Sequence, residues 1–250
     1  MNNRRLFGLL GKNISHSFSP GYFKEKFRKE GISAEYVLFD LPNIEKIKDV
    51  VNNNPQLEGF NVTIPYKKEI IPLLDTVDDM ASTVGAVNVV KIYRHSRKPV
   101  LKGFNTDVTG FRKSLNPLIA EKKSLKALVL GTGGASDAVC YAIKLMNIPF
   151  IKISRKKNKD TLTYEELSGD LIRQHRLIVN TTPLGMNPET DTFPNIPYEY
   201  ITKQHILYDL IYNPVKTKFL MLGENKGALI KNGLEMLHGQ ADAAWEIWNR

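Results

Sequence analysis

Short apolar runs alternate with amphipathic segments along the whole chain, and this alternation restricts the fold more than any other feature of the sequence. Buried strands that are each followed by a helix are typical of α/β proteins, in which helices cover the faces of a largely parallel sheet. We expect strands near residues 4–10, 35–40, 58–63, 149–154, 177–181 and 206–211. We expect helices near residues 19–30, 43–53, 66–74 and 234–248. The sequence therefore predicts an α/β protein.

Local signals refine this outline. Ser19 is expected to be the N-cap of the first helix, with Pro20 at its first helical position. A further helix is expected to begin just after Pro65. Residues 86–105 have β-rich runs on either side of a basic turn at residues 94–98, which predicts a hairpin. The hairpin is followed by a predicted helix that leads into a second unit of the fold.

The length of the chain is sufficient for one large domain or two small ones, and we expect two. It has 250 residues, of which 42% are hydrophobic and 24% charged, as in ordinary globular proteins. No apolar run approaches the roughly 18 residues that span a bilayer. The apolar stretch near the start is too short for a signal peptide. We therefore expect a cytoplasmic protein with no membrane partner.

Charge and metal-binding residue types exclude several classes of protein. The net charge of +9 is spread along the chain, and no nucleic-acid-binding motif accompanies it, so we expect no nucleic-acid partner. The single cysteine, Cys140, excludes an intramolecular disulfide and falls on the apolar stripe of a predicted helix. The five histidines lack metal-ligand spacing, which predicts no metal site.

The strongest local motif is a glycine turn between a buried strand and a helix. In a dinucleotide-binding fold, the first glycine, here Gly131, makes the tight turn, and the next, Gly133, lets the backbone approach the pyrophosphate. The helix N-terminus offers N–H groups and a positive dipole end to the anion. Ser136 occupies the third glycine position, and Asp137 stands in the first helical turn, where we expect it to face solvent. Strand, turn and helix together predict a nucleotide site.

Basic residues follow the next predicted strand, about 20 residues further on. The sequence there is Ser154, Arg155, Lys156 and Lys157, where NAD-binding proteins carry an Asp or Glu for the ribose 2′-hydroxyl. A guanidinium fork suits a doubly charged phosphate. The alternative interpretation is a solvated basic loop. The position favours NADP over NAD.

Three other motifs are ambiguous when each is taken alone. Residues 15–20 (SHSFSP) precede the first helix, where hydroxyls and free N–H groups either cap the helix or bind a carboxylate. Residues 61–68 (NVTIPYKK) end in Lys67 and Lys68, and a lysine just after a buried strand is either a surface charge or an acid–base group. Residues 103–107 (GFNTD) carry a similar ambiguity.

Nine motifs, taken together in one order, give the chain a specific resemblance. They are SHSFSP, GFNVTIPYK, GAVN, GFNTD, GTGGAS, SR, NTTPLGM, DLIYNP and GLEMLHGQA. In this order they resemble the shikimate dehydrogenase family over essentially the whole chain. The resemblance implies an N-terminal α/β substrate domain and a Rossmann-type doubly wound NADP-binding domain, with the C-terminal helix returning to the first domain. We expect residues 1–105 plus 228–250 to form the substrate-binding and catalytic domain, and residues 106–227 the NADP-binding domain.

The resemblance also implies an activity, the NADPH-dependent reduction of 3-dehydroshikimate to shikimate in the pathway to chorismate and aromatic amino acids. Lys67 and Asp107 would form an acid–base pair lining an interdomain cleft, while Lys68 would be a surface charge. The substrate would be contacted by Ser17, Ser19, Thr63, Asn88, Tyr212 and Gln240. The cofactor would be contacted by Gly131, Gly133, Gly134, Ala135, Ser154, Arg155, Lys156, Asn180, Thr181, Leu210 and Gly233.

The match to the family departs from its pattern at two positions, and other functions remain open. Val89 stands where a threonine commonly follows the asparagine, and Val108 where a glycine commonly follows the aspartate. One alternative is a quinate/shikimate dehydrogenase that uses NAD. Another is a non-catalytic nucleotide-binding sensor, although such a protein is expected to have lost the acid–base pair that this chain keeps. Family members occur as monomers and dimers, so we expect a monomer or a homodimer.

Overall fold

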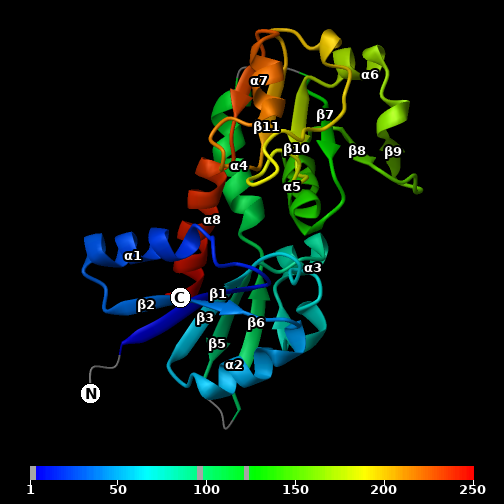
Figure 1. The fold of residues 1–250 in the computed structure, drawn as a ribbon. Helices are drawn as coiled ribbons and strands as arrows, with labels where there is room; N and C mark the ends of the chain where they lie inside the picture. The colour runs from blue at the N-terminus through cyan, green and yellow to red at the C-terminus, as the bar shows by residue number, and fades with distance from the viewer. Residues whose placement is uncertain (1–3, 95–97, 121–123) are drawn as a thin grey trace. The chain divides into compact units, whose positions relative to one another are not determined.

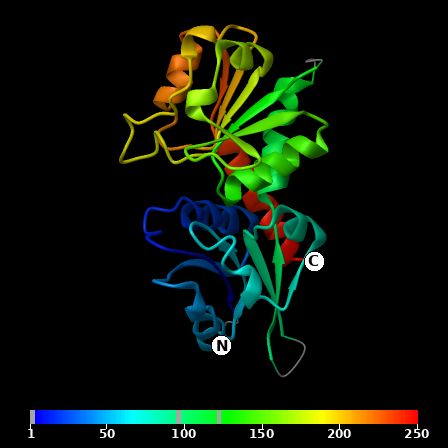
Figure 2. The ribbon, with the colours of Figure 1, turned by 90° about the vertical axis from the view of Figure 1, so that its right-hand side faces the viewer.

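The computed structural model describes residues 4–94, 98–120 and 124–250 (Figures 1 and 2). The chain divides into two compact units. The first comprises Met1–Thr106 and Ala241–Arg250, and the second comprises Asp107–Gln240. The chain therefore leaves the first unit once and returns to it at its end.

The first unit is built on a mixed six-stranded sheet of order β2-β1-β3-β5-β6-β4. Its strands are β1 (Arg5–Gly11), β2 (Ala34–Asp40), β3 (Leu57–Val62), β4 (Thr76–Val77), β5 (Val89–Tyr93) and β6 (Val100–Phe104). Its helices are α1 (Ser19–Glu30), α2 (Ile47–Asn53) and α3 (Asp79–Val84), with short 3-10 turns at Ile44–Lys46 and Ile71–Leu73. β1 pairs in parallel with β2 and β3, whereas β5 is antiparallel to β3 and β6. The expected hairpin is thus confirmed for the described residues, and residues 95–97 of its turn lie outside them.

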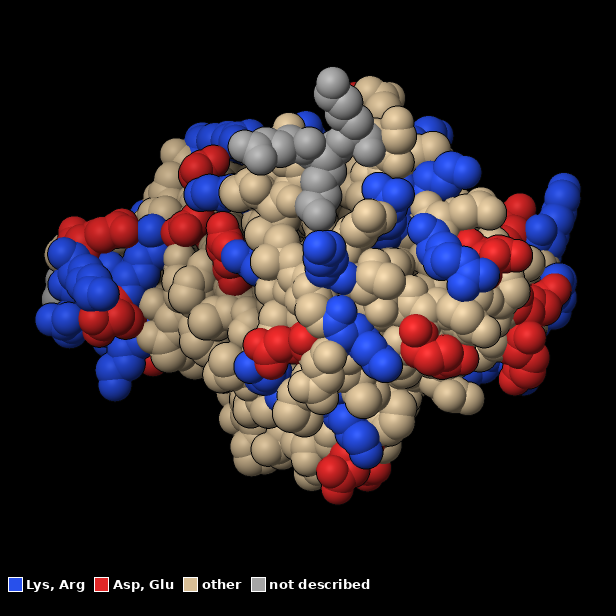
Figure 3. All heavy atoms as spheres, turned by 90° about the horizontal axis from the view of Figure 1, so that it is seen from above, with Lys and Arg blue, Asp and Glu red and all other residues tan. Residues whose placement is uncertain are grey.

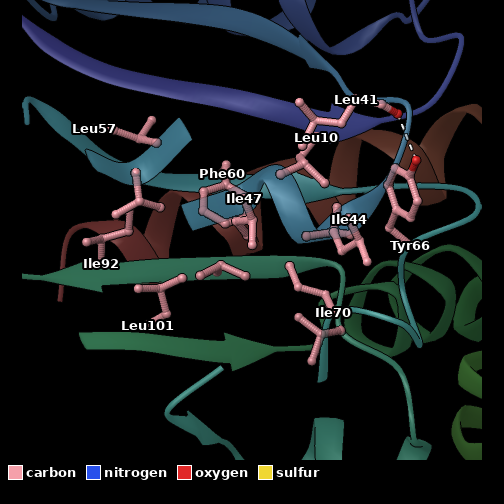
Figure 4. Packing of buried hydrophobic residues seen from close by; sticks show 14 of the residues in the cluster. Leu10, Leu41, Ile44, Ile47, Leu57, Phe60, Tyr66, Ile70, Ile92 and Leu101 are labelled. Atoms are coloured by element: carbon pink, nitrogen blue, oxygen red, sulfur yellow. Dashed lines mark hydrogen bonds between the residues drawn. The ribbon is translucent and has the colours of Figure 1, made fainter. Parts of the chain in front are cut away.

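Apolar clusters cover both faces of this sheet, as the residues of β1 show by alternating between two such clusters. Leu6 and Leu10 belong to a cluster that includes Ile47 of α2 (Figure 4). Phe7 and Leu9 belong to the opposite cluster, which includes residues of α1 and the end of α8 (Leu234–Trp248). The Trp248 indole N–H also donates to the Val90 carbonyl at 3.0 Å. The last helix is therefore part of the first unit's core.

The helix expected at residues 66–74 is wrong. The segment is a series of turns that ends in the 3-10 turn Ile71–Leu73. Pro72 has no N–H to donate and would interrupt an α-helix at this point. The turns are held in place by two buried residues: the Tyr66 hydroxyl donates to the Leu41 carbonyl at 2.7 Å (Figure 4), and Ile70 is fully buried.

The second unit is built on a parallel six-stranded sheet of order β12-β11-β10-β7-β8-β9. Its strands are β7 (Ala127–Leu130), β8 (Phe150–Ser154), β9 (Thr161–Thr163), β10 (Leu177–Asn180), β11 (Ile206–Asp209) and β12 (Leu229–Lys231). Its helices are α4 (Asp107–Ile119), α5 (Gly134–Leu145), α6 (Gly169–Gln174), α7 (Lys218–Glu224) and the start of α8, with 3-10 turns at Tyr164–Glu166 and Tyr198–Tyr200. The central strands β7, β10 and β11 are buried throughout, as expected for a parallel sheet covered on both faces.

Helices lie on both faces of this second sheet (Figures 1 and 2). Ile172 of α6 and Phe219 of α7 pack in one apolar cluster with residues of the central strands. On the other face, the Phe111 ring of α4 lies 5.0 Å from the Tyr208 ring of β11, measured between centroids. Cys140 of α5 is buried, as predicted.

The α/β fold with two domains is confirmed, including the return of the last helix. The expected boundary at residue 227 differs from the observed division, because β12 pairs with β11 and belongs to the second sheet. Among the described residues, no helix combines the length and apolarity needed to cross a bilayer.

Candidate active site

The glycine turn of the second unit lies at the carboxyl end of β7, where it leads into α5. Gly131 has a φ of +117°, a conformation that side chains rarely adopt, and a Cβ there would lie 2.6 Å from the Thr181 hydroxyl oxygen. Gly133 has open space around the same position and is the N-cap of α5. The turn thus combines a tight bend with a backbone surface that an anion can approach, next to the N-terminus of a helix. The residues present fit the pyrophosphate of a dinucleotide.

Ser136, at the third glycine position, braces this turn. Its hydroxyl is buried and donates to the Gly131 carbonyl at 2.7 Å. The Thr181 hydroxyl donates to the Leu130 carbonyl at 2.6 Å, and the Gly131 N–H donates to the Ile153 carbonyl at 2.9 Å. A serine therefore substitutes for glycine here by hydrogen-bonding to the turn, and Thr181 is joined separately to the strand that precedes the turn.

The expectation that Asp137 faces solvent is wrong. Its carboxylate pairs with the Lys152 ammonium of β8 at 2.8 Å, and the two side chains are only 19% and 23% exposed. Burial acts to lower the pKa of Lys152, but the hydrogen bond and charge of Asp137 outweigh it and raise that pKa. The negative charge in the first turn of α5 is thus neutralised within the protein.

The basic residues after β8 differ in their partners. Lys157 forms an ion pair with Glu166, whereas the structure as described shows no carboxylate partner for Arg155 or Lys156. Both of these side chains are exposed, and the Lys156 N–H donates to the Ser154 hydroxyl at 3.3 Å. Burial raises the pKa of the neighbouring Tyr164 to about 12, and the positive charge of Arg155 opposes that rise. Two cations thus remain at the strand end where a 2′-phosphate is expected.

The residues expected at the nicotinamide end lie at the end of β10 and on the loops that follow β10, β11 and β12. Asn180 is the last residue of β10 and is fully buried. Gly233 packs directly on Leu210, because a Cβ on Gly233 would lie 1.9 Å from the Leu210 carbonyl oxygen. The structure therefore gathers these residues and the glycine turn along the carboxyl edge of one parallel sheet, the usual ligand edge of this fold.

In the first unit, the expected role of Ser19 as N-cap is wrong. α1 begins at Ser19 itself, with Phe18 at the N-cap position. The Ser17 hydroxyl accepts a hydrogen bond from the Ser19 N–H at 3.3 Å, so the serine two positions earlier stabilises the helix start. Ser17 and Ser19 are half-buried, and Ser15 and His16 are exposed.

A buried polar network connects Ser19 to the strand ends of the first unit. The Tyr36 hydroxyl, which also hydrogen-bonds with Ser19, donates to Asn61 Oδ1 at 2.7 Å. Asn61 Nδ2 donates to the Asn88 carbonyl at 3.3 Å, and Asn88 Oδ1 accepts from the Thr106 N–H at 2.7 Å. Burial raises the pKa of Tyr36 well above its usual range, so the network is neutral.

Lys67 and Lys68 differ in burial. Lys67 is half-buried, and its carbonyl accepts from the Val87 N–H at 2.8 Å, which fixes its backbone beside the polar strand ends. Lys68 is exposed, although it lies on a turn and not on the helical face that we expected. Thr63 begins this segment, and its N–H donates to the Leu10 carbonyl at 2.9 Å. Lys67 is therefore partly enclosed by the protein, whereas Lys68 is open to solvent.

The remaining predicted site residues belong to the second unit. Asp107 is the first residue of α4 and is only 5% exposed. Tyr212 is half-buried on the loop after β11, and Gln240 lies on α8 with its Nε2 donating to the Leu237 carbonyl at 3.0 Å. The pairing of Lys67 with Asp107 stays a prediction.

Sequence reasoning missed several buried polar residues of these networks. Asn61 lies within a motif that was used only for its neighbours, and Tyr36 lies within a predicted strand. Asp209 and Thr217 of the second unit are both fully buried. A carboxylate inside the apolar run 206–211 was a signal that could have identified Asp209.

The face seen in Figure 3 carries charges of both signs, with lysine and arginine side chains interspersed among acidic ones.

Within residues 4–94, 98–120 and 124–250, no group of three or more His, Cys, Asp or Glu side chains is placed to hold a metal ion. Fold and site together define a two-domain α/β protein in which the second unit has the features of a dinucleotide-binding domain.

Comparison with known proteins identifies the family. Residues 9–90 match the family model described as the shikimate dehydrogenase substrate binding domain. The shikimate dehydrogenase (NADP(+)) of Methanococcus aeolicus is 38% identical and aligns over 98% of this chain and 91% of its own. The crystal structure of shikimate dehydrogenase from Aquifex aeolicus is 36% identical, with a TM-score of 0.88 over 100% of this chain and 94% of that one. The enzyme from Thermus thermophilus, solved with NADP(H) and shikimate, is 30% identical, with a TM-score of 0.84 over 98% of this chain and 93% of its own. The chain therefore belongs to the family of NADP-dependent shikimate dehydrogenases, as its motifs suggested.

Proposed function

We propose that this chain catalyses the reversible NADPH-dependent reduction of 3-dehydroshikimate to shikimate, a step toward chorismate and the aromatic amino acids. The observation that carries the proposal is similarity along 98% of the chain to a relative named shikimate dehydrogenase (NADP(+)). The glycine turn and the cations after β8 support it independently. We further propose that the second unit binds NADP and that the first binds the substrate.

On the cofactor side, Gly131, Gly133, Gly134 and Ala135 would hold the pyrophosphate at the N-terminus of α5. Arg155 and Lys156, with the Ser154 hydroxyl between strand and loop, would hold the 2′-phosphate, for which a guanidinium fork is well shaped. Asn180, Thr181, Leu210 and Gly233 would line the nicotinamide end. When bound, the nicotinamide supplies the hydride.

On the substrate side, hydroxyl and amide groups would orient a carboxylate and ring hydroxyls. Ser17 and Ser19 would bind the carboxylate at the start of α1, where N–H groups and the helix dipole favour an anion. Thr63, Asn88, Tyr212 and Gln240 would contact the remaining polar groups of the ring. These side chains are neutral, so they can bind hydroxyls as donors or as acceptors.

We propose Lys67 as the proton donor and Asp107 as its partner. Hydride addition to a ketone builds negative charge on the oxygen, and an ammonium group that donates a proton there lowers the barrier. A carboxylate keeps such an ammonium oriented and shares its protons. Lys68, exposed on the same turn, offers a matched control for position and charge.

An assay of the purified protein that crosses shikimate and quinate with NADP and NAD tests this function. We expect shikimate oxidation with NADP to have the largest kcat/KM of the four combinations. Preferred turnover with NAD or with quinate would contradict the proposed specificity. Tight NADP binding without turnover of either substrate would contradict an enzymatic role and favour a sensor.

A further inference from the structure

A fully buried carboxylate lies beneath the loops at the carboxyl edge of the second sheet. Asp209 is the last residue of β11, and its side chain is 0% exposed. Its Oδ1 accepts from Asn180 Nδ2 at 3.0 Å and from the Ile211 N–H at 3.1 Å. Its Oδ2 accepts from the Thr217 hydroxyl at 2.5 Å. Every one of these bonds uses the carboxylate as an acceptor.

The three donors come from three separate segments of the second unit. Asn180 ends β10, Ile211 lies on the loop after β11, and Thr217 is the N-cap of α7, where its hydroxyl also accepts from the Leu220 N–H at 3.4 Å. One carboxylate therefore ties the end of a neighbouring strand to the start of the following helix. The two loops are joined again further out, where the Asn187 N–H donates to the Asn213 carbonyl at 3.3 Å.

Asn180 extends the network into the loop after β10. Its Oδ1 accepts from the Thr182 N–H at 3.0 Å and from the Thr182 hydroxyl at 2.7 Å. Its Nδ2 donates to the Leu184 carbonyl at 3.3 Å as well as to Asp209. The amide of Asn180 is thus fixed in one orientation, because its oxygen faces N–H and O–H donors and its nitrogen faces acceptors.

The backbone fastened by this network includes the positions proposed to line the nicotinamide. Leu210 directly follows Asp209, and its N–H donates to the Asn180 carbonyl at 3.0 Å. The Gly233 N–H donates to the Ile211 carbonyl at 3.0 Å, and Gly233 leaves no room for a side chain above Leu210. A shift of the Asp209 carboxylate would therefore move Asn180 and Leu210 together.

We propose that Asp209 is the positioning residue of the nicotinamide end, where it holds Asn180 and Leu210 at the distance that the ring requires. This inference rests on the proposed function of the second unit. Asp209 acts through its neighbours and touches neither cofactor nor substrate. An apolar side chain would fill the same space without the cost of burying a carboxylate, so stability alone does not account for an acid at this position.

Substitutions of Asp209 and Thr217 separate this role from a merely structural one. Asp209→Asn keeps the shape but replaces one acceptor oxygen with an amide nitrogen, which can only donate. Thr217→Val removes the hydroxyl that donates to Asp209, and Thr217→Ser restores it. Ser114→Ala is the matched control, because Ser114 accepts a hydrogen bond at 2.9 Å from the buried hydroxyl of Tyr208, the residue before Asp209.

The readout compares a ligand that has a nicotinamide with one that lacks it. Titration with NADPH and with adenosine 2′,5′-bisphosphate, which keeps the adenine and the 2′-phosphate, gives the two Kd values for each folded variant. We expect Asp209→Asn and Thr217→Val to weaken NADPH binding and lower kcat by about 10-fold each, the scale of one buried hydrogen bond. Their affinity for the bisphosphate stays within about twofold, as does every parameter of Ser114→Ala and Thr217→Ser.

Two results would overturn the inference. One is unchanged NADPH affinity and kcat in folded Asp209→Asn and Thr217→Val. The other is an equal loss of affinity for NADPH and for the bisphosphate, which would indicate general loosening of the second unit. If Asp209→Asn does not fold, the comparison of Thr217→Val with Thr217→Ser decides alone. The titrations need no turnover, so a wild-type protein that fails to oxidise shikimate would contradict the proposed function and leave this comparison decisive.

Discussion

Both units contain a network of buried polar side chains, but the two networks differ in charge. In the first unit, Tyr36, Asn61 and Asn88 form a neutral network of hydroxyl and amide groups. In the second unit, the corresponding network is centred on the Asp209 carboxylate. Neutral groups can reverse donor and acceptor roles, whereas a carboxylate only accepts. The first network is therefore suited to a ligand rich in hydroxyls, and the second imposes one fixed arrangement on its loops.

Removing Lys67 should give the largest loss of activity, because Lys67 is the only proton donor proposed. The buried network of the first unit is neutral and supplies no other charged group. We expect Lys67→Ala to lower kcat by on the order of 10²-fold or more, the usual range for a general acid. Steady-state kinetics with shikimate and NADP measures this. Lys68→Ala should leave kcat within about twofold, as for other surface substitutions. A folded Lys67→Ala protein with unchanged kcat would remove Lys67 from the proposed mechanism.

The charged network of the second unit should make stability depend on pH. Burial raises the pKa of Asp209 to about 7, while hydrogen bonds from Thr217, Ile211 and Asn180 act to lower it. The ordinary value for Asp in an unfolded chain is about 3.9. Between these values the folded protein keeps a proton that the unfolded chain releases, so stability falls as the pH rises through this window.

We expect urea unfolding to show a loss of about 3 kcal/mol between pH 5 and pH 8 from this group. The reference is Asp209→Asn, in which the same position does not titrate. Subtracting its profile from that of the wild type isolates the contribution of Asp209. Parallel profiles in the two proteins would show that the carboxylate does not have a raised pKa.

Substitution of Arg155 tests whether the positive charge after β8 binds the 2′-phosphate of NADPH. We expect Arg155→Ala to lower kcat/KM for NADPH by about 10-fold, as for one charge-assisted hydrogen bond at an exposed site. Turnover with NADH should change little, because NADH lacks the 2′-phosphate. Lys157→Ala is the control, since Lys157 is paired with Glu166. Equal losses with both nucleotides would contradict a phosphate clamp at Arg155.

Tyr36 tests the neutral network and gives the smallest expected effect. Tyr36→Phe removes the hydroxyl that donates to Asn61 and should lower the free energy of unfolding by about 1 kcal/mol. The loss should be the same at pH 5 and pH 8, since the groups involved do not titrate in this range. A loss that varies with pH would show that the contrast between the two networks is incorrect.

The sequence predicted elements whose signal is local. Strand and helix periodicity located the two sheets, and a strand followed by glycines and a helix located the turn at Gly131. What it missed depends on partners that are distant along the chain. Asp137 pairs with Lys152, 15 residues further along the chain, and Asp209 accepts a hydrogen bond from Asn180, which lies 29 residues earlier. The helix near residues 66–74 failed for a local reason that was readable, since Pro72 lies within it.

The return of α8 to the first unit gives the second unit the form of an insertion. Residues 107–240 are one continuous segment, and its two ends lie side by side, since a Cβ on Gly110 would be 2.5 Å from the Met236 carbonyl oxygen. Adjacent ends are the condition under which one domain is accommodated inside another. The second unit could therefore be replaced by the matching segment of a relative. Such a replacement needs only two junctions, and these lie next to each other. Such chimeras would exchange the proposed cofactor-binding loops together with Asp107, Tyr212 and Gln240, which the same segment carries.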